Sequence, residues 1–378
     1  MTVRRTPEAW MARALVLARR GLYTTDPNPR VGCVLVKDGQ RVGEGWHVRA
    51  GEPHAEIHAL HAAGEAARGA TAYVTLEPCS HQGRTGPCAA ALVAAGVARV
   101  IVAMRDPNPL VAGRGIARLR EAGIEVEVGL LEAQARALNP GFIARMARGR
   151  PFVRLKMAMS LDGRTAMRSG ESQWITGPRA RREVQRLRAR SSAVLTGVES
   201  VIFDNSRLTV RADQLELPEG AAIAARQPLR VVVDSRLRLP EAAACLREPG
   251  RTLVATLEGQ DGEHRARLEA AGAEVLALPA AVDGRVDLAA LLRHLAEREA
   301  VNEVLLETGA TLAGAMLDAD LVDEMQLFVA PTLLGGEARP LFALPGLERM
   351  EQQRPLEILD IRAVGRDWRI TARPRRDA

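Results

Sequence analysis

Two short segments of the sequence decide the fold of its first part: they read PHAE at residues 53–56 and EPCSHQGRTGPC at residues 77–88. His54 begins a segment with helical character. Cys79 follows an apolar, strand-like run, and Cys88 begins the next helical segment. Zinc in catalytic sites takes three protein ligands with nitrogen or sulfur donors and leaves a fourth position open for water. One imidazole and two thiolates meet this requirement, so these three residues are predicted to hold zinc.

The carboxylate of Glu56 belongs to the same site, because Glu56 lies two residues after His54 at the same predicted helix N-terminus. It can face the open metal position without being a ligand. Zinc lowers the pKa of a bound water to about 7, and a carboxylate beside that water can pass its proton to a leaving amine. His-x-Glu followed by Pro-Cys and a second cysteine is typical of zinc deaminases. A structural zinc site is the alternative, but such sites usually have four protein ligands.

The spacing of the two cysteines departs from the short form of the deaminase pattern, which has two residues between them. Here residues 80–87 separate Cys79 from Cys88, and we expect this longer loop to influence the choice of substrate. Asn28 precedes the first predicted strand and can hydrogen-bond a bound ring, although a plain turn explains it equally well. His47, taken alone, is predicted to be a surface histidine.

The first part of the chain alternates between helical and strand-like patterns, which indicates α/β layering. An apolar helical face follows the N-cap, first-turn proline and acid at residues 6–8. A hairpin with a turn at residues 37–40 comes next. The expected strands are 31–36, 41–46, 72–76, 100–104 and 125–128, and the expected helices include 54–67, 88–95 and 115–121.

Residues 139–151 contain Asn-Pro-Gly, a basic helix and Gly-Arg-Pro, and they mark the domain boundary. We predict one domain over 1–148 and a second over 149–378. In the second domain the expected strands are 152–157, 193–196, 229–233, 252–256, 274–277, 303–307 and 324–330, closed by antiparallel strands at 356–363 and 367–372; the expected helices are 178–190, 264–271, 287–298 and 311–319.

The second domain has no Gly-x-Gly-x-x-Gly after a strand, so a Rossmann fingerprint is absent. The best candidate for phosphate binding is the turn at residues 307–311, Glu-Thr-Gly-Ala-Thr, between a strand and a helix. Glycine lets the backbone approach an anion, and a helix N-terminus offers free N–H groups. A simple strand-to-helix turn is the alternative. Lys156 lies in an apolar strand, where its pKa can shift; it is a candidate proton donor, and an ordinary salt bridge is its alternative.

Composition limits the classes of function. The net charge is +6, but only two of the 52 basic residues are lysines and 46 acids accompany them, so a solvated mixed-charge surface explains the charge. Hydrophobic residues make up 47% of the chain, which argues against disorder. Four cysteines are too few for a disulfide framework.

No apolar run reaches the length of a membrane span, and no signal peptide is recognisable. We therefore expect a cytoplasmic protein with no membrane partner.

The motifs of both halves together resemble the bifunctional deaminase–reductase family of riboflavin biosynthesis. The resemblance covers nearly the whole chain and is least distinctive over residues 213–300. Besides 53–56 and 77–88, it rests on Lys156 with 160-SLDGR-164, on 169-SGESQWIT-176, on 208-LTVR-211, and on Glu307, Gly309 and 311-TLAG-314.

The resemblance implies two successive reactions. The first is zinc-dependent deamination of 2,5-diamino-6-ribosylamino-4(3H)-pyrimidinone 5′-phosphate. The second is NADPH-dependent reduction of the ribosyl chain of 5-amino-6-(5-phosphoribosylamino)uracil to ribityl. It also implies a cytidine-deaminase-like, three-layer N-terminal domain and a dihydrofolate-reductase-like C-terminal domain. The family further suggests a homo-oligomer, either a dimer or a tetramer.

The resemblance also implies roles for the individual residues that stand at the family's motif positions. Glu56 and Lys156 are the expected catalytic residues, and His54, Cys79 and Cys88 are the expected zinc ligands. Glu307 matches a substrate contact, and Arg188 and Arg211 suit the 5′-phosphate through bidentate contacts. The expected substrate positions are Asn28, His47, His81, Arg84, Ser172, Arg188, Leu208, Arg211 and Glu307; the expected NADPH positions are Ala158, Trp174, Ser200, Asp204, Ser235, Gly309, Ala310, Thr311, Leu312, Ala313, Gly314 and Ala315.

Three departures from the family pattern affect these roles. Position 84 is Arg where relatives can have Lys, which keeps the charge but changes the geometry. Gly86 stands where the pattern often has Pro, so the loop is less rigid. The run at 203–207, Phe-Asp-Asn-Ser-Arg, replaces the more usual Asp-Asp-Pro and weakens the cofactor assignment there.

Two other functions compete with this interpretation. A nucleic-acid deaminase with a basic binding domain is consistent with the pI of about 9.7 and the zinc motif. However, aromatic residues make up only 3% of the chain, which is few for a base-stacking platform. The other alternative is a second domain that binds cofactor without catalysis.

Overall fold

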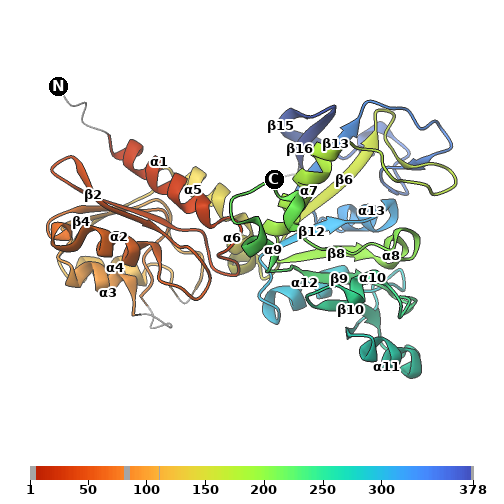
Figure 1. Cartoon of the computed structure of the whole chain (residues 1–378), viewed down its shortest axis with the longest axis horizontal. Coiled ribbons are helices and arrows are strands. Elements are labelled where there is room, and N and C mark those ends of the chain that lie inside the picture. The colour runs from red at the N-terminus through yellow and green to blue at the C-terminus, as the bar shows by residue number, and fades with distance from the viewer. Residues whose placement is uncertain (1–5, 81–85, 110, 376–378) are drawn as a thin grey trace. The chain divides into compact units, whose positions relative to one another are not determined.

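The computed structural model describes residues 6–80, 86–109 and 111–375. The chain divides into two compact units, Met1–Gly149 and Arg150–Ala378 (Figure 1). Two predicted substrate residues, His81 and Arg84, lie outside the described residues.

The first unit is built on a five-stranded sheet with the strand order β2-β1-β3-β4-β5. β1 is antiparallel to both β2 and β3, whereas β3, β4 and β5 are parallel. Asp38 and Gly39 both have positive φ in the β1–β2 turn, which is the geometry that Asp-Gly favours in a two-residue hairpin. The strands are β1 (Gly32–Lys37), β2 (Gln40–Trp46), β3 (Thr71–Val74), β4 (Arg99–Val102) and β5 (Glu125–Val128).

Helices cover both faces of this sheet. α1, α5 and α6 pack on one face through a cluster that includes Trp10, Leu17 and Phe142. α2, α3 and α4 contribute to the cluster on the opposite face. The expected three-layer fold is therefore confirmed. The helices are α1 (Pro7–Ala18), α2 (Ala55–Ala63), α3 (Cys88–Ala94), α4 (Arg114–Glu121), α5 (Glu132–Leu138) and α6 (Pro140–Arg148).

The helix predicted over 54–67 ends earlier, because Gly64 takes a φ of 53° and a 3-10 turn, Gly64–Ala67, follows. α2 also lies unusually close to β2. A Cβ on Gly45 would meet the carbonyl oxygen of Ala55 at 2.6 Å. Gly43 and Gly45 of β2 have no side chain toward α2, which allows α2 to sit against the sheet, and this fixes the position of His54.

The second unit contains a nine-stranded sheet with the order β11-β10-β9-β8-β12-β6-β13-β16-β15. The first seven strands in this order are parallel, and β16 and β15 add an antiparallel edge. The strands are β6 (Phe152–Ser160), β8 (Ala193–Gly197), β9 (Leu229–Val233), β10 (Thr252–Leu257), β11 (Ala273–Leu278), β12 (Glu303–Glu307), β13 (Glu324–Ala330), β15 (Leu356–Val364) and β16 (Asp367–Pro374), with a small separate pair, β7 (Arg164–Ala166) and β14 (Arg339–Pro340).

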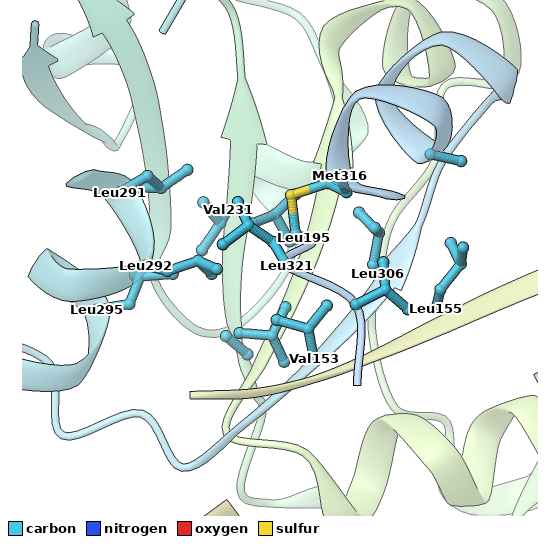
Figure 2. Packing of buried hydrophobic residues seen from close by; sticks show 14 of the residues in the cluster. Val153, Leu155, Leu195, Val231, Leu291, Leu292, Leu295, Leu306, Met316 and Leu321 are labelled. Atoms are coloured by element: carbon cyan, nitrogen blue, oxygen red, sulfur yellow. The ribbon is translucent and has the colours of Figure 1, made fainter. Parts of the chain in front are cut away.

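The core of the second unit lies between this sheet and the helices α12 and α13. Leu291, Leu292 and Leu295 of α12 point toward strand residues such as Val231 and Leu195 (Figure 2). α7 packs through Val184 and other apolar residues in a separate cluster with Val194, Leu305 and Phe328. The helices are α7 (Pro178–Arg190), α8 (Val198–Asp204), α9 (Gly220–Ala224), α10 (Ala244–Arg247), α11 (Gly262–Ala270), α12 (Leu288–Glu297) and α13 (Ala310–Asp318).

The predicted elements of the second unit are present, with ends that shift by a few residues. β6 continues three residues beyond the predicted end at Met157 because it pairs with β13 as far as Ser160. α8 was not predicted, because its short sequence VESVIFD follows β8 directly and has no separate turn signal. In the described part of the chain, no helix combines the length and apolarity that a membrane span requires.

Candidate active sites

Three predicted metal ligands meet at one point in the first unit. His54 is the N-cap of α2, Cys88 is the first residue of α3, and Cys79 lies in the loop after β3. Nδ1 of His54 is 3.3 Å from Sγ of Cys88 and 3.7 Å from Sγ of Cys79. Around a tetrahedral zinc with ordinary bond lengths, such atoms lie about 3.6 Å apart. The donor set and its spacing therefore fit zinc.

The helix N-terminus and the neighbouring groups favour a thiolate at this point. The backbone N–H of Cys88 donates to Sγ of Cys79 at 3.3 Å. Hydrogen bonds from the Cys88 thiol and from the His54 imidazole outweigh burial and lower the pKa of Cys79. The thiolate is the form of cysteine that binds metals. Cys79 is therefore prepared to act as a ligand.

Glu56 lies in the first turn of α2 and is buried, with 3% of its surface exposed. Burial raises the pKa of Glu56 to about 7, and the His54 imidazole opposes this increase. A carboxyl group whose pKa is near neutrality can both accept and release a proton, as a general acid–base catalyst must.

His47 is buried, with 2% of its surface exposed, so the surface position expected from the residue alone is wrong. The Asn28 side-chain amide donates to Nε2 of His47 at 3.2 Å, and Nδ1 donates to the carbonyl of Pro53 at 3.1 Å. This pattern corresponds to neutral imidazole, and burial lowers the pKa of His47. Its ring also lies edge-on to the ring of His54, at 5.3 Å between centroids. The tertiary structure thus joins Asn28 and His47 to the metal site.

Glu77 supports the metal loop in a way that sequence reasoning missed. Its buried carboxylate accepts four backbone N–H groups: Asp106 at 3.2 Å and Gly113 at 3.0 Å on Oε2, and Gly115 at 3.0 Å and Ile116 at 3.3 Å on Oε1. The acid therefore ties the start of α4 to the segment that carries Cys79. Its position directly before Pro78-Cys79 was the available signal.

Asn139 is a second support that the sequence did not reveal. Its side-chain amide forms a two-way pair with the backbone of Arg30, accepting from N at 2.8 Å and donating to O at 2.9 Å. Both residues are buried. Because Asn28 lies two residues before Arg30, this pair helps to hold it in place.

The second unit contains a cavity of about 2230 Å³ at the ends of the parallel strands. Lys156 and Glu307 line it and occupy paired positions on β6 and β12. Arg188 forms a bidentate ion pair with Glu307. Its Nε donates to Oε1 at 2.6 Å, and its Nη2 donates to Oε2 at 3.0 Å. The structure therefore gives Arg188 a carboxylate partner, whereas the sequence suggested only a phosphate.

Lys156, Glu307 and Arg188 influence one another's protonation. Burial lowers the pKa of Lys156, Glu307 opposes this decrease, and Arg188 adds to it. Burial alone would raise the pKa of Glu307, but Arg188, followed by Lys156, outweighs burial and lowers that pKa. An ionised carboxylate and an amine with a lowered pKa face the same cavity, which is suitable for proton transfer to a bound substrate.

The predicted reductase residues nearly all meet at this cavity. The Ser172 hydroxyl also donates to Asp204 at 3.3 Å, which links a predicted substrate residue to a predicted cofactor residue. The residues on the cavity wall are Ser172, Arg188, Leu208, Arg211 and Glu307 from the substrate set, and Ala158, Trp174, Ser200, Asp204, Ser235, Gly309, Ala310, Thr311, Leu312 and Ala315 from the cofactor set.

Two members of the predicted cofactor set, Ala313 and Gly314, do not line the cavity. Both are buried in α13, and Ala313 belongs to the core of the unit. A Cβ on Gly314 would meet the carbonyl oxygen of Ala343 at 1.8 Å, so this glycine allows a close backbone approach. The helical repeat therefore directs part of the segment away from the cavity.

Comparison with known proteins agrees with this geometry. Residues 4–104 match the cytidine and deoxycytidylate deaminase zinc-binding region, and residues 151–370 match the RibD C-terminal domain. The chain is 52% identical to the Escherichia coli riboflavin biosynthesis protein RibD over 95% of this chain and 97% of that protein.

Two solved structures resemble the whole chain. Acinetobacter baumannii RibD has a TM-score of 0.90 and 49% identity, covering 98% of this chain and 99% of that one. A diaminohydroxyphosphoribosylaminopyrimidine deaminase/5-amino-6-(5-phosphoribosylamino)uracil reductase from Thermotoga maritima has a TM-score of 0.82 and 34% identity, covering 97% and 98%.

Fold and sites together define a bifunctional enzyme in which a zinc-dependent deaminase precedes an NADPH-dependent reductase. The chain belongs to the RibD family of riboflavin biosynthesis proteins. The nucleic-acid deaminase alternative is not favoured, because the second unit matches the RibD C-terminal domain.

The role of Glu77 leads to a prediction for Glu77→Gln. The amide places an N–H₂ group against backbone N–H donors, and each buried donor left without a partner costs about 1–3 kcal/mol. We expect a lower melting temperature and faster loss of zinc to a chelator, because the loop that carries Cys79 loosens. Thermal unfolding and metal analysis measure the two effects. Glu121→Gln, an exposed change on the same helix α4, is the control, and equal behaviour of the two variants would contradict the proposed support.

Proposed function

We propose that the first unit deaminates 2,5-diamino-6-ribosylamino-4(3H)-pyrimidinone 5′-phosphate, with His54, Cys79 and Cys88 as the zinc ligands. The observation that carries this assignment is the meeting of one imidazole and two thiols beside the buried carboxyl group of Glu56. The predicted limits 1–148 and 149–378 place this reaction and the reduction in separate domains. The division of the chain after Gly149 supports those limits.

Zinc held by His54, Cys79 and Cys88 would supply a water molecule whose pKa is close to 7 and which would be a nucleophile at neutral pH. The role proposed for Glu56 is to accept a proton from the attacking water and to deliver a proton to the exocyclic amino group of the pyrimidine. Water adds its oxygen to the ring carbon, the carbon–nitrogen bond breaks, and ammonia leaves, so that the products are the aminouracil and NH₃. Burial of Glu56 keeps this proton between the reacting groups.

We further propose that Asn28 and His47 orient the pyrimidine ring. The Asn28 amide is held by the neutral His47 ring, which is itself held by the carbonyl of Pro53. Such a chain of hydrogen bonds leaves the amide of Asn28 little freedom to rotate. His81 and Arg84, which lie outside the described residues, are proposed as further substrate contacts.

In the second unit we assign reduction of the ribosyl group to Lys156 and Glu307. NADPH supplies the hydride. Lys156 is proposed to give a proton to the oxygen released when the ribose ring opens, and Glu307 to hydrogen-bond the sugar or ring. The pairing of the two residues across β6 and β12 at one cavity supports this assignment. Arg211 is proposed to hold the 5′-phosphate, together with Arg188 if that residue exchanges its carboxylate partner.

The remaining contacts follow the family pattern. Ser172 and Leu208 are proposed for the substrate, and the Gly309–Ala315 segment with Ala158, Trp174, Ser200, Asp204 and Ser235 for the cofactor. We place both reactions in the cytoplasm, where metal-binding thiols remain reduced.

We propose that the protein is a homo-oligomer, at least a dimer, that uses the β15–β16 edge. β15 is the last strand of the sheet, and Ile358, Ile361 and Trp368 on this pair are each about half exposed: 51%, 55% and 52%. An exposed apolar edge strand is a template for pairing with another chain. A second copy offers the same strand and can pair with it by two-fold symmetry.

Glu56→Ala is expected to keep its zinc and to release no measurable ammonia, because the ligands remain while the proton carrier is gone. Metal analysis and an ammonia assay with the diaminopyrimidine substrate measure this. The internal control is oxidation of NADPH with the deaminated substrate, which should proceed at the wild-type rate. Normal ammonia release would refute the role of Glu56.

Lys156→Ala is expected to slow NADPH oxidation roughly a hundredfold or more, which is typical for loss of a general acid, and to leave ammonia release unchanged. Lys37→Ala, which removes the other lysine of the chain, is the control. Equal reduction rates in the two variants would remove Lys156 from the mechanism. If the unmodified protein binds NADPH but never oxidises it, the second domain binds cofactor without catalysis.

Ile361→Asp is expected to reduce the molar mass in solution to that of a smaller species, because it places a charge in the proposed interface. Light scattering during size-exclusion chromatography, at several protein concentrations, measures this mass. Val16→Asp, at a similarly exposed apolar position on α1, should leave the mass unchanged. An unchanged mass for Ile361→Asp would exclude the β15–β16 edge as the interface.

A further inference from the structure

Among the arginines on the wall of the reductase cavity that the reactions described above do not use, three lie on two turns that are joined to each other. Arg236 and Arg238 follow the end of β9, and Arg285 lies in the turn that precedes α12. All three are exposed at their side chains and line the same cavity as Lys156 and Glu307.

Hydrogen bonds hold the two turns that carry these arginines. The Ser235 hydroxyl accepts the N–H of Val286 at 3.1 Å, which joins one turn to the other. The Asp234 carboxylate accepts the N–H of Leu239 at 2.7 Å and so closes the first turn. Ala281 donates to the carbonyl of Arg285 at 2.7 Å within the second. The backbone positions of the arginines are therefore fixed relative to one another.

The three arginines have different partners. Arg238 pairs with Glu199 at 2.6 Å, and Arg285 lies 3.7 Å from Asp283. Among the described residues, Arg236 has no ion-pair partner. Exposed ion pairs of this kind contribute only about 0–1 kcal/mol, so an incoming dianion can replace the two acids at little cost. Arg236 is already available.

The position of this group relative to Lys156 and Glu307 matches the length of a dinucleotide. The strands run in the order β9-β8-β12-β6, so three steps of about 4.8 Å place the end of β9 about 14 Å from β6. Gly309 and the N-terminus of α13 follow β12, between the two ends, and offer backbone N–H groups to a pyrophosphate. A nicotinamide at Lys156 and Glu307 would place the adenosine ribose at the end of β9.

From this placement we infer that Arg236, assisted by Arg238 and Arg285, binds the 2′-phosphate of the adenosine ribose and selects NADPH over NADH. The inference rests on the proposed reductase function and names the residues that determine its cofactor specificity. The two cofactors differ only in this phosphate. A planar guanidinium can donate two parallel hydrogen bonds to a phosphate, and a single charged contact of this kind accounts for a roughly 10- to 100-fold difference in affinity.

A binding experiment tests the assignment without requiring reductase activity. Calorimetry compares adenosine 2′,5′-bisphosphate with adenosine 5′-monophosphate on the full-length protein and on Arg236→Ala. We expect the unmodified protein to bind the bisphosphate more tightly, and Arg236→Ala to weaken bisphosphate binding roughly 10- to 100-fold while binding the monophosphate as before. Arg293→Ala, an exposed arginine of α12 outside the cavity wall, is the matched control.

Kinetics with the deaminated substrate give the second measurement. Arg236→Ala should raise the KM for NADPH by a similar factor, with kcat and the KM for NADH unchanged; the Arg236→Lys variant should recover part of the loss. An equal effect on both cofactors, or none on either, would overturn the assignment. Absence of any NADPH oxidation by the unmodified protein, together with normal discrimination between the two adenosine phosphates, would contradict the reductase function and leave the 2′-phosphate site in place.

Discussion

The N-termini of α2 and α3 converge on one point, and the chemistry of the first unit depends on this convergence. His54 precedes α2, and Cys88 begins α3, so the helix starts bring an imidazole and a thiol within 3.3 Å. The N–H of Cys88 then faces Sγ of Cys79. This is possible because β2 carries glycine where α2 crosses it, at Gly43 and Gly45. A larger residue at either position would move the helix, and the ligand with it.

Two buried residues, Glu77 and Asn139, hold the loops that surround the predicted metal site. Glu77 binds four backbone N–H groups, and Asn139 binds both backbone groups of Arg30. Neither residue touches a predicted ligand side chain in these contacts. Each instead holds a loop, one carrying Cys79 and the other carrying Asn28. Residues outside the first layer of a metal site commonly determine how well its ligands are oriented.

The second unit places its groups by a different principle, the common edge at which parallel strands end. β6, β12, β8 and β9 are neighbours in the sheet, although β8 and β9 lie between β6 and β12 in the sequence. Lys156 and Glu307 become partners across β6 and β12 for this reason. The same edge extends to the turn after β9, where arginines continue the cavity wall. A long cofactor can therefore contact several strands at once without a Rossmann fingerprint.

The sequence by itself determined the elements and the metal chemistry, because both depend on local signals. Helix caps, the Asp-Gly turn and the spacing of His54, Glu56, Cys79 and Cys88 act over a few residues, and β5, α7, β9, β12 and β13 have the limits that the pattern predicted. Only the tertiary structure decided which distant groups meet. It buried His47 beside Asn28, paired Arg188 with Glu307, and turned Ala313 and Gly314 away from the cavity. These outcomes depend on strand order, helix phase and burial, and no short segment of the chain contains that information.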